Sequence, residues 1–208
     1  MPWTSATSDG DASSLTSVLV LGGSSAVGAF AILQLRKFLP ASTVILTTCS
    51  TRNHDLVKSL GANNAFDPTS ATLLDDIRAA SPSKGGVPAI LDCVNGAAIR
   101  HDTLEALDAH GSKLFVEVPS GTNIAPEQIP EGITAKKAGA YAIIEKMGMV
   151  EGGSGLRDLM VAFEGLLERK EIGMPLKVDV VGQGLESIEQ GLDRLKKGVS
   201  ATKLVVTL

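Results

Sequence analysis

The sequence predicts a doubly wound parallel α/β sheet followed by a C-terminal strand–helix–strand appendage. Apolar and β-branched runs alternate with helical segments along most of the chain, which is the pattern of a parallel sheet covered by helices. A glycine-rich turn joins the first apolar run to the first helix. Hydrophobic residues make up 44% of the chain but aromatic residues only 3%, which favours an aliphatic core over an all-β sandwich.

The first strands and helices have clear boundaries. Ser17–Leu21 is dominated by Val and Leu and is predicted as the first strand. The helix after it covers Ala26–Phe38, and Pro40 ends this helix. β-branched residues predict a second strand over Thr43–Thr48. A short helix over His54–Leu60 is closed by a glycine, as is typical of helix C-termini.

The alternation continues to the end of the chain. Further strands are expected at Asn64–Asp67, Pro88–Val94, Lys113–Val118 and Lys137–Ile144. Further helices are expected at Ala71–Ala80, Ala97–Ala109 and Gly155–Arg169, and a Pro- and Gly-containing loop at Pro119–Lys136. The appendage consists of a strand, an amphipathic helix and a strand, at Leu176–Val181, Leu185–Lys196 and Lys203–Leu208.

Composition excludes several classes of function. The net charge of −4 argues against nucleic acid as the main partner. The two cysteines, Cys49 and Cys93, lie outside any CxxC pair, so we expect no metal site and interpret them as buried thiols. No apolar run reaches membrane-spanning length, and no signal peptide is recognisable. A reducing, cytoplasmic compartment is therefore expected, and residues 1–16 are expected to form a flexible leader.

The turn after the first strand has the composition of a phosphate-binding corner. Gly23-Ser24-Ser25-Ala26-Val27-Gly28 fits the pattern GxGxxG, with Ser25 at the middle glycine. Gly23 would permit the tight turn, and Gly28 would let the helix pack close to the sheet. The helix N-terminus would offer free N–H groups and a positive dipole end to a pyrophosphate. Residues 17–175 are therefore predicted to form a Rossmann-like dinucleotide-binding domain.

The end of the second strand indicates which dinucleotide is preferred. An NAD site usually carries Asp or Glu here to bind the ribose 2′-hydroxyl, but residues 47–53 contain no carboxylate. Ser50 and Arg52 are placed instead where they could hold a 2′-phosphate. The sequence therefore favours NADPH over NADH. Asp92 and Glu117 are expected at the same edge of the sheet, where Asp92 is either a functional carboxylate or, as we prefer, a helix cap.

Four segments resemble the medium-chain dehydrogenase/reductase superfamily, in particular its zinc-independent fungal trans-acting enoyl reductases. The segments are LVLGGSSAVG at 19–28, TTCSTRNHDLVKSLGA at 47–62, ILDCV at 90–94 and VSATKLVVTL at 199–208. The resemblance implies that the chain acts with a polyketide synthase in fungal secondary metabolism. It also implies that residues 176–208 are the C-terminal remnant of the family's catalytic domain, whose N-terminal part is absent.

The resemblance assigns cofactor-binding roles to particular positions. Ser24, Ser25, Ala26 and Val27 would lie against the pyrophosphate, between Gly23 and Gly28. The 2′-phosphate would be surrounded by Ser50, Thr51, Arg52 and Asn53. In the tail, Val199 and Ser200 match a segment that approaches the cofactor, and Tyr141 to Glu145 matches one that lines the substrate cavity. Two positions depart from the family pattern, Pro68 in place of a tyrosine and Glu145-Lys146 in place of a neutral turn.

Three functional hypotheses remain open at this point. The first is an NADPH-dependent enoyl reductase acting on a small-molecule substrate, in which a second copy or a partner subunit covers the apolar faces left open by the absent domain. The second is a cofactor-independent isomerase, cyclase or dehydratase that reuses the pocket. Its candidate acid–base groups are Asp92, His101, Tyr141, Glu145 and Lys146. The third is a non-catalytic partner protein.

Overall fold

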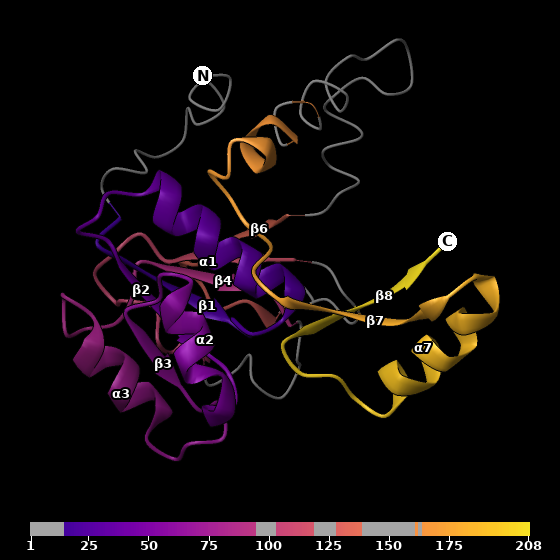
Figure 1. Cartoon of the computed structure of the whole chain (residues 1–208). Helices are drawn as coiled ribbons and strands as arrows, with labels where there is room; N and C mark the ends of the chain where they lie inside the picture. Colours follow the sequence, from indigo (N-terminus) through magenta and orange to yellow (C-terminus); the bar gives the residue numbers. More distant parts are fainter. Residues whose placement is uncertain (1–14, 95–102, 119–127, 139–160, 162–163) are drawn as a thin grey trace, which may run out of the picture.

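The computed structural model describes residues 15–94, 103–118, 128–138, 161 and 164–208 (Figure 1). Within these ranges, one six-stranded sheet has the order β3-β2-β1-β4-β5-β6. Its strands are β1 (Ser17–Leu21), β2 (Val44–Thr48), β3 (Asn64–Phe66), β4 (Ala89–Asp92), β5 (Leu114–Glu117) and β6 (Thr134–Lys137). All neighbouring strands are parallel. The predicted doubly wound sheet is therefore confirmed, and its strand order reverses between β1 and β4.

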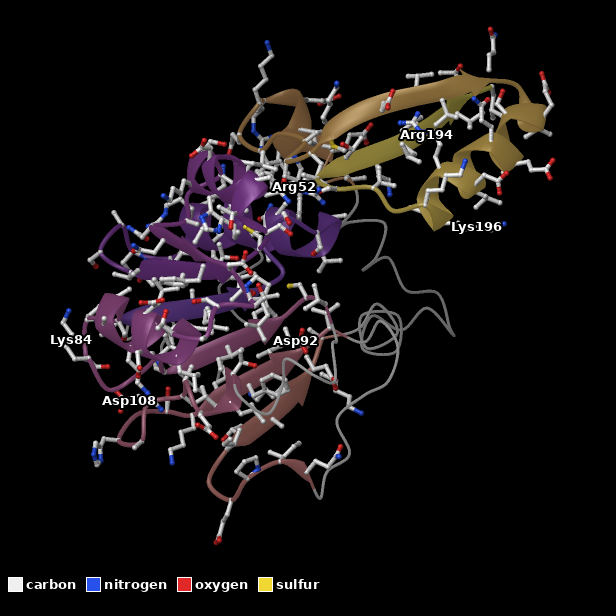
Figure 2. All side chains as sticks on the ribbon, turned by 90° about the horizontal axis from the view of Figure 1, so that it is seen from below. Arg52, Lys84, Asp92, Asp108, Arg194 and Lys196 are labelled. Carbon is white, nitrogen blue, oxygen red and sulfur yellow. The ribbon has the colours of Figure 1, made fainter. Side chains whose placement is uncertain are left out.

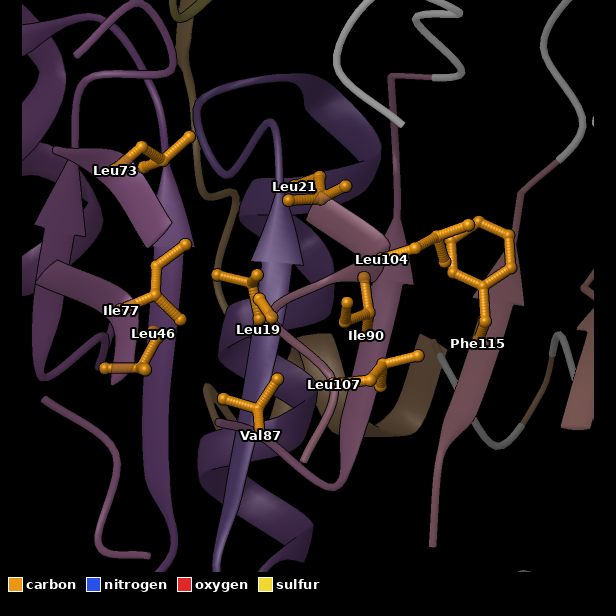
Figure 3. Packing of buried hydrophobic residues seen from close by; sticks show 11 residues of the cluster. Leu19, Leu21, Leu46, Leu73, Ile77, Val87, Ile90, Leu104, Leu107 and Phe115 are labelled. Carbon is orange, nitrogen blue, oxygen red and sulfur yellow. The ribbon is translucent and has the colours of Figure 1, made fainter. Parts of the chain in front are cut away.

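Helices cover both faces of this sheet. α1 (Ala26–Phe38) and α2 (His54–Ser59) bury Ile32 and Val57 in an aliphatic cluster on one face. α3 (Leu73–Ala80) packs in the cluster on the opposite face, which Figure 3 shows with Phe115 at its edge. Because both faces are covered, every residue of β1 is buried, which explains why its sequence is a continuous hydrophobic run rather than an alternating one.

The ends of the first two helices follow the signals in the sequence. Leu39 has an extended backbone (φ −87°, ψ 156°), as expected for a residue that precedes a proline, and α1 stops there. Gly61 follows α2 with a φ of +116°, a conformation that a side chain would strain. The boundaries predicted for β1 and α1 are confirmed to the residue, and those of β2, β3, α2, α3 and β5 to within two residues.

Two predicted boundaries were wrong. The helix expected to reach Ala109 ends at Leu104 in the described part of the chain. Leu107 instead forms a parallel bridge with Val87, whose N–H donates to the carbonyl of Ala106 at 2.8 Å. The sixth strand begins at Thr134, inside the expected loop, because the Thr134 N–H bonds the carbonyl of Lys113 at 2.9 Å and extends the sheet.

The tail forms a separate two-stranded parallel sheet with a helix packed on it. Its elements are β7 (Lys177–Gln183), the short 3₁₀ turn η4 (Leu185–Ser187), α7 (Ile188–Lys196) and β8 (Thr202–Thr207), which confirms the predicted strand–helix–strand order. Figure 1 shows this unit projecting to one side of the main sheet. Residue 161 and residues 164–168 are helical, in agreement with the helix expected over Gly155–Arg169.

Candidate functional site

The turn between β1 and α1 is built around three glycines. Gly22, one residue before the GxGxxG pattern, has a φ of +75°, the left-handed conformation that favours glycine. A Cβ at Gly23 would overlap Thr47, and a Cβ at Gly28 would overlap the carbonyl of Gly22. Gly28 therefore lets the start of α1 approach the end of β1, as the sequence predicted, and Gly23 lets the turn pack against β2.

Two hydrogen bonds fix this turn on the sheet. The N–H of Gly22 donates to Thr48 Oγ1 at 3.1 Å, and the N–H of Gly23 donates to the Thr48 carbonyl at 2.9 Å. The turn is thus held over the carboxyl ends of β1 and β2, next to the point where the strand order reverses. In open α/β sheets, ligands bind in the crevice at this position.

The N-terminus of α1 presents hydrogen-bond donors on the surface. Ser25 is the N-cap, and its hydroxyl accepts from the N–H of Gly28 at 3.0 Å while keeping its own proton for donation. The N–H groups of Ala26 and Val27 have no acceptor among the described residues, and both residues are exposed. Together with the helix dipole, these donors suit an anionic group.

A second turn follows β2 and contains Arg52, the only cation among the predicted cofactor-binding residues. Ser50, Thr51 and Arg52 are exposed, whereas Asn53 is buried. The N–H of Asn53 donates to the carbonyl of Ser50 at 2.8 Å and closes the turn. Arg52 makes no ion pair or hydrogen bond with the part of the chain that the structure describes, and Figure 2 shows it near the junction with the tail.

Two side chains from distant segments hold this turn. Thr51 Oγ1 donates to Asp67 Oδ2 at 3.0 Å, and Asn53 Nδ2 donates to Ser200 Oγ at 3.0 Å. Ser200 thus lies beside the turn, and Val199 precedes it in a half-buried position. The cofactor contact that the resemblance implies for these two residues stays a prediction. The tail and the 50–53 turn are in direct contact.

Asp67 was not among the predicted site residues. It follows β3 at the carboxyl edge of the sheet, where its Oδ1 also accepts from the N–H and hydroxyl of Thr69 at 2.8 and 2.6 Å. The hydrogen bonds from Thr69, and then the one from Thr51, lower the pKa of Asp67. Its position after a strand end is the signal that could have indicated it.

The two cysteines are free and buried, as predicted. Burial, and secondarily the charge of Asp67, raises the pKa of the Cys49 thiol to about 11. Burial, and secondarily the charge of Asp92, raises the pKa of Cys93 to about 12. Both are therefore protonated near neutral pH, which disfavours a role as nucleophiles.

Asp92 and Glu117 lie side by side at the ends of β4 and β5, and both are buried. Asp92 Oδ1 accepts from the N–H of Val94 at 3.0 Å, so this carboxylate fixes the loop that leaves β4. The helix start that we expected it to cap lies outside the described residues. So do the other candidate acid–base groups, His101, Tyr141, Glu145 and Lys146.

Within the described ranges, no three His, Cys, Asp or Glu side chains come together in a group that could hold a metal ion. No helix in the described part of the chain is long and apolar enough to cross a bilayer. Hydrogen bonds attach the glycine turn to the end of β2, and attach the turn with Arg52, which follows β2, to the tail residue Ser200.

Curated proteins similar to this chain include a fungal dehydrogenase and a fungal trans-enoyl reductase. No protein-family model matches the chain. It is 37% identical over 200 residues to the dehydrogenase orf1 of Aspergillus niger, which covers 92% of this chain and 53% of that protein. It is 31% identical over 192 residues to the trans-enoyl reductase tndF of Aspergillus flavipes, with 92% and 53% covered. The chain thus spans about half the length of the curated relatives it matches.

Solved structures with the same fold include enoyl reductases. The CurK enoyl reductase superposes with a TM-score of 0.70 at 18% identity, covering 92% of this chain and 54% of that one. The CurF ER cyclopropanase superposes with a TM-score of 0.71 at 16% identity and the same coverage. A mycobacterial protein complexed with NADPH superposes with a TM-score of 0.66 at 16% identity, covering 93% and 56%.

Proposed function

Because the chain belongs to the medium-chain dehydrogenase/reductase superfamily, with fungal trans-enoyl reductases among its relatives, we propose that it binds NADPH and serves the reduction of a conjugated carbon–carbon double bond. The single observation that carries this proposal is the glycine turn. Its glycines let the turn pack against β2 and let α1 begin close to the end of β1, which places the free N–H groups of the helix start at the carboxyl edge of the sheet. Every helix start has unpartnered N–H groups, and what supports binding here is their place beside the point where the strand order reverses.

The residues present fit a dinucleotide. The N–H groups of Ala26 and Val27, with the hydroxyls of Ser24 and Ser25, would bind the pyrophosphate at the positive end of α1. The 2′-phosphate would bind in the 50–53 turn, where Arg52 has no partner within the described chain. Charge-assisted hydrogen bonds from a guanidinium favour a phosphate over the neutral hydroxyl of NADH.

The cofactor, when bound, supplies the hydride for the reduction. This chain's own residues would bind and orient it at the crevice between β1 and β4. No catalytic residue is assigned. We propose that residues 176–208 are the C-terminal remnant of the family's catalytic domain and that a second copy or a partner subunit covers their exposed apolar face.

Calorimetric titration of the purified chain with NADPH and NADH tests this proposal. Micromolar affinity for NADPH with a clear preference over NADH is the expected result. Absence of binding by both nucleotides would overturn the reductase assignment and favour the cofactor-independent isomerase, cyclase or dehydratase, or a non-catalytic partner protein. Equal affinity for NADPH and NADH would support dinucleotide binding and overturn only the preference for the 2′-phosphate.

A further inference from the structure

The turn that contains Arg52 is held in place by segments far from it in sequence. Asn53 Nδ2 donates to Ser200 Oγ, 147 residues along the chain, and Thr51 Oγ1 donates to Asp67 Oδ2. Arg52 lies between these two attached residues and is itself exposed. Its backbone is thus constrained on both sides, while its guanidinium is left to meet a ligand.

The bond to Ser200 has particular weight because Asn53 is buried. Only 8% of Asn53 is exposed, so its amide depends on partners within the chain. The same residue closes the turn through its N–H, which donates to the carbonyl of Ser50 at 2.8 Å. Loss of the Ser200 hydroxyl would leave a buried donor without its partner at the residue that closes the turn.

From this geometry we propose that Ser200 is a positioning residue for phosphate recognition: it acts through Asn53 and holds the 50–53 turn in the conformation in which Arg52 binds a phosphomonoester. This inference rests on the proposed binding of NADPH. It makes the tail part of the nucleotide-selecting site, although the tail belongs to a separate sheet. Ser200 then contributes to selectivity without touching the phosphate.

The first test needs no ligand. Hydrogen–deuterium exchange of the backbone N–H of Asn53 is compared in the wild-type chain, Ser200→Ala and Ser200→Thr. Since one lost hydrogen bond of this kind is worth about 1 kcal/mol, Ser200→Ala should raise the exchange rate roughly three- to tenfold, and Ser200→Thr should restore it. Ser59→Ala is the control, because the Ser59 hydroxyl bonds only the carbonyl of Leu56 in α2. Unchanged exchange in Ser200→Ala overturns the proposal.

The second test uses adenosine 2′,5′-bisphosphate and AMP, which differ by the 2′-phosphate. Ser200→Ala should lower the affinity for the bisphosphate about three- to tenfold and the affinity for AMP less than about twofold. If Ser200 acts through Asn53, Asn53→Ala and the double variant should bind the bisphosphate equally well. A further loss in the double variant would show direct contact between Ser200 and the ligand and overturn the positioning role. Failure of the wild-type chain to bind either nucleotide would overturn the proposed function itself, and with it this inference.

Discussion

Arg52 is the single side chain on which the proposed nucleotide preference depends. It is exposed and has no partner among the described residues, so its charge is available to a ligand. Arg52→Ala should lower the affinity for NADPH about 10- to 100-fold and the affinity for NADH less than about twofold. The reason is that a hydrogen bond to a charged group contributes about 1.5–3 kcal/mol. Calorimetry measures both. Lys58→Ala, which removes an exposed cation from the neighbouring α2, is the matched control. Equal losses for the two nucleotides would contradict the assignment.

Gly28 is a predicted cofactor-binding residue that also matters for the stability of the fold. A Cβ there would overlap the backbone carbonyl of Gly22, and backbone cannot move aside as a flexible side chain can. Gly28→Ala should lower the free energy of unfolding by about 1–3 kcal/mol, the usual effect of overpacking. Urea denaturation measures it, with Gly173→Ala as the control because nothing lies within 4 Å of its added Cβ. Equal stability of both variants would contradict the close approach of α1 to β1.

At the residue scale, the sequence predicted the location of the site residues more accurately than the role of each one. The GxGxxG pattern pointed to Gly23 and Gly28, but the left-handed conformation belongs to Gly22, just outside the pattern. The position of Asp67 after a strand end could have indicated that it lies at the site, but its contact with Thr51 joins two separate loops and leaves no local pattern. The buried state of both cysteines was predictable because each follows a buried strand.

Among the elements, α1 is linked to the segment before the tail by one ion pair. Glu171 accepts from Lys37 of α1 at 2.7 Å and from Arg169 at 2.6 Å. Hydrogen bonds from Arg169 first, and Lys37 next, lower the pKa of Glu171 from 4.5 to about 2. A lowered folded-state pKa stabilises the fold above the unfolded value, and this contribution is lost as the pH falls from about 4.5 towards 2.

Glu171→Gln should therefore lower the urea midpoint near pH 6 slightly and by a smaller amount near pH 2, because the pair is exposed and screened. The measurement is the difference between the urea midpoints of wild-type and variant across this pH range. Glu168→Gln is the control, since Glu168 has no ion pair with a described residue. A difference that grows as the pH falls would contradict the sign of this linkage.

The elements that were predicted well are those fixed by local chemistry. β1 and α1 follow from an apolar run, an N-cap serine and a proline, and all three act within a few residues. The segment around Leu107 was predicted as the end of a helix over Ala97–Ala109. Its actual state depends on pairing with Val87, twenty positions away, and no local signal encodes that pairing. Thr134 joins the sheet for the same reason.

At the scale of the whole molecule, the tail exposes several large apolar side chains. Leu185, Ile188, Leu192 and Leu195 form one stripe and are between 45% and 68% exposed. Val178 and Val180 of β7 are also exposed. Surface of this kind usually marks a contact with another molecule. The ion pair between Arg194 and Asp179 instead connects α7 to β7, so the tail is internally braced while its apolar face stays open.

This open face predicts self-association. Light scattering at micromolar concentration should give a mass above the 21.5 kDa of one chain. A carboxylate on the stripe would have to be desolvated in any contact, so Leu192→Glu should shift the mass towards that of the monomer. Gln190→Glu adds the same charge to a polar position of α7 and should leave the mass unchanged. A wild-type chain that stays strictly monomeric at this concentration would contradict self-association and would require a different subunit to cover the stripe.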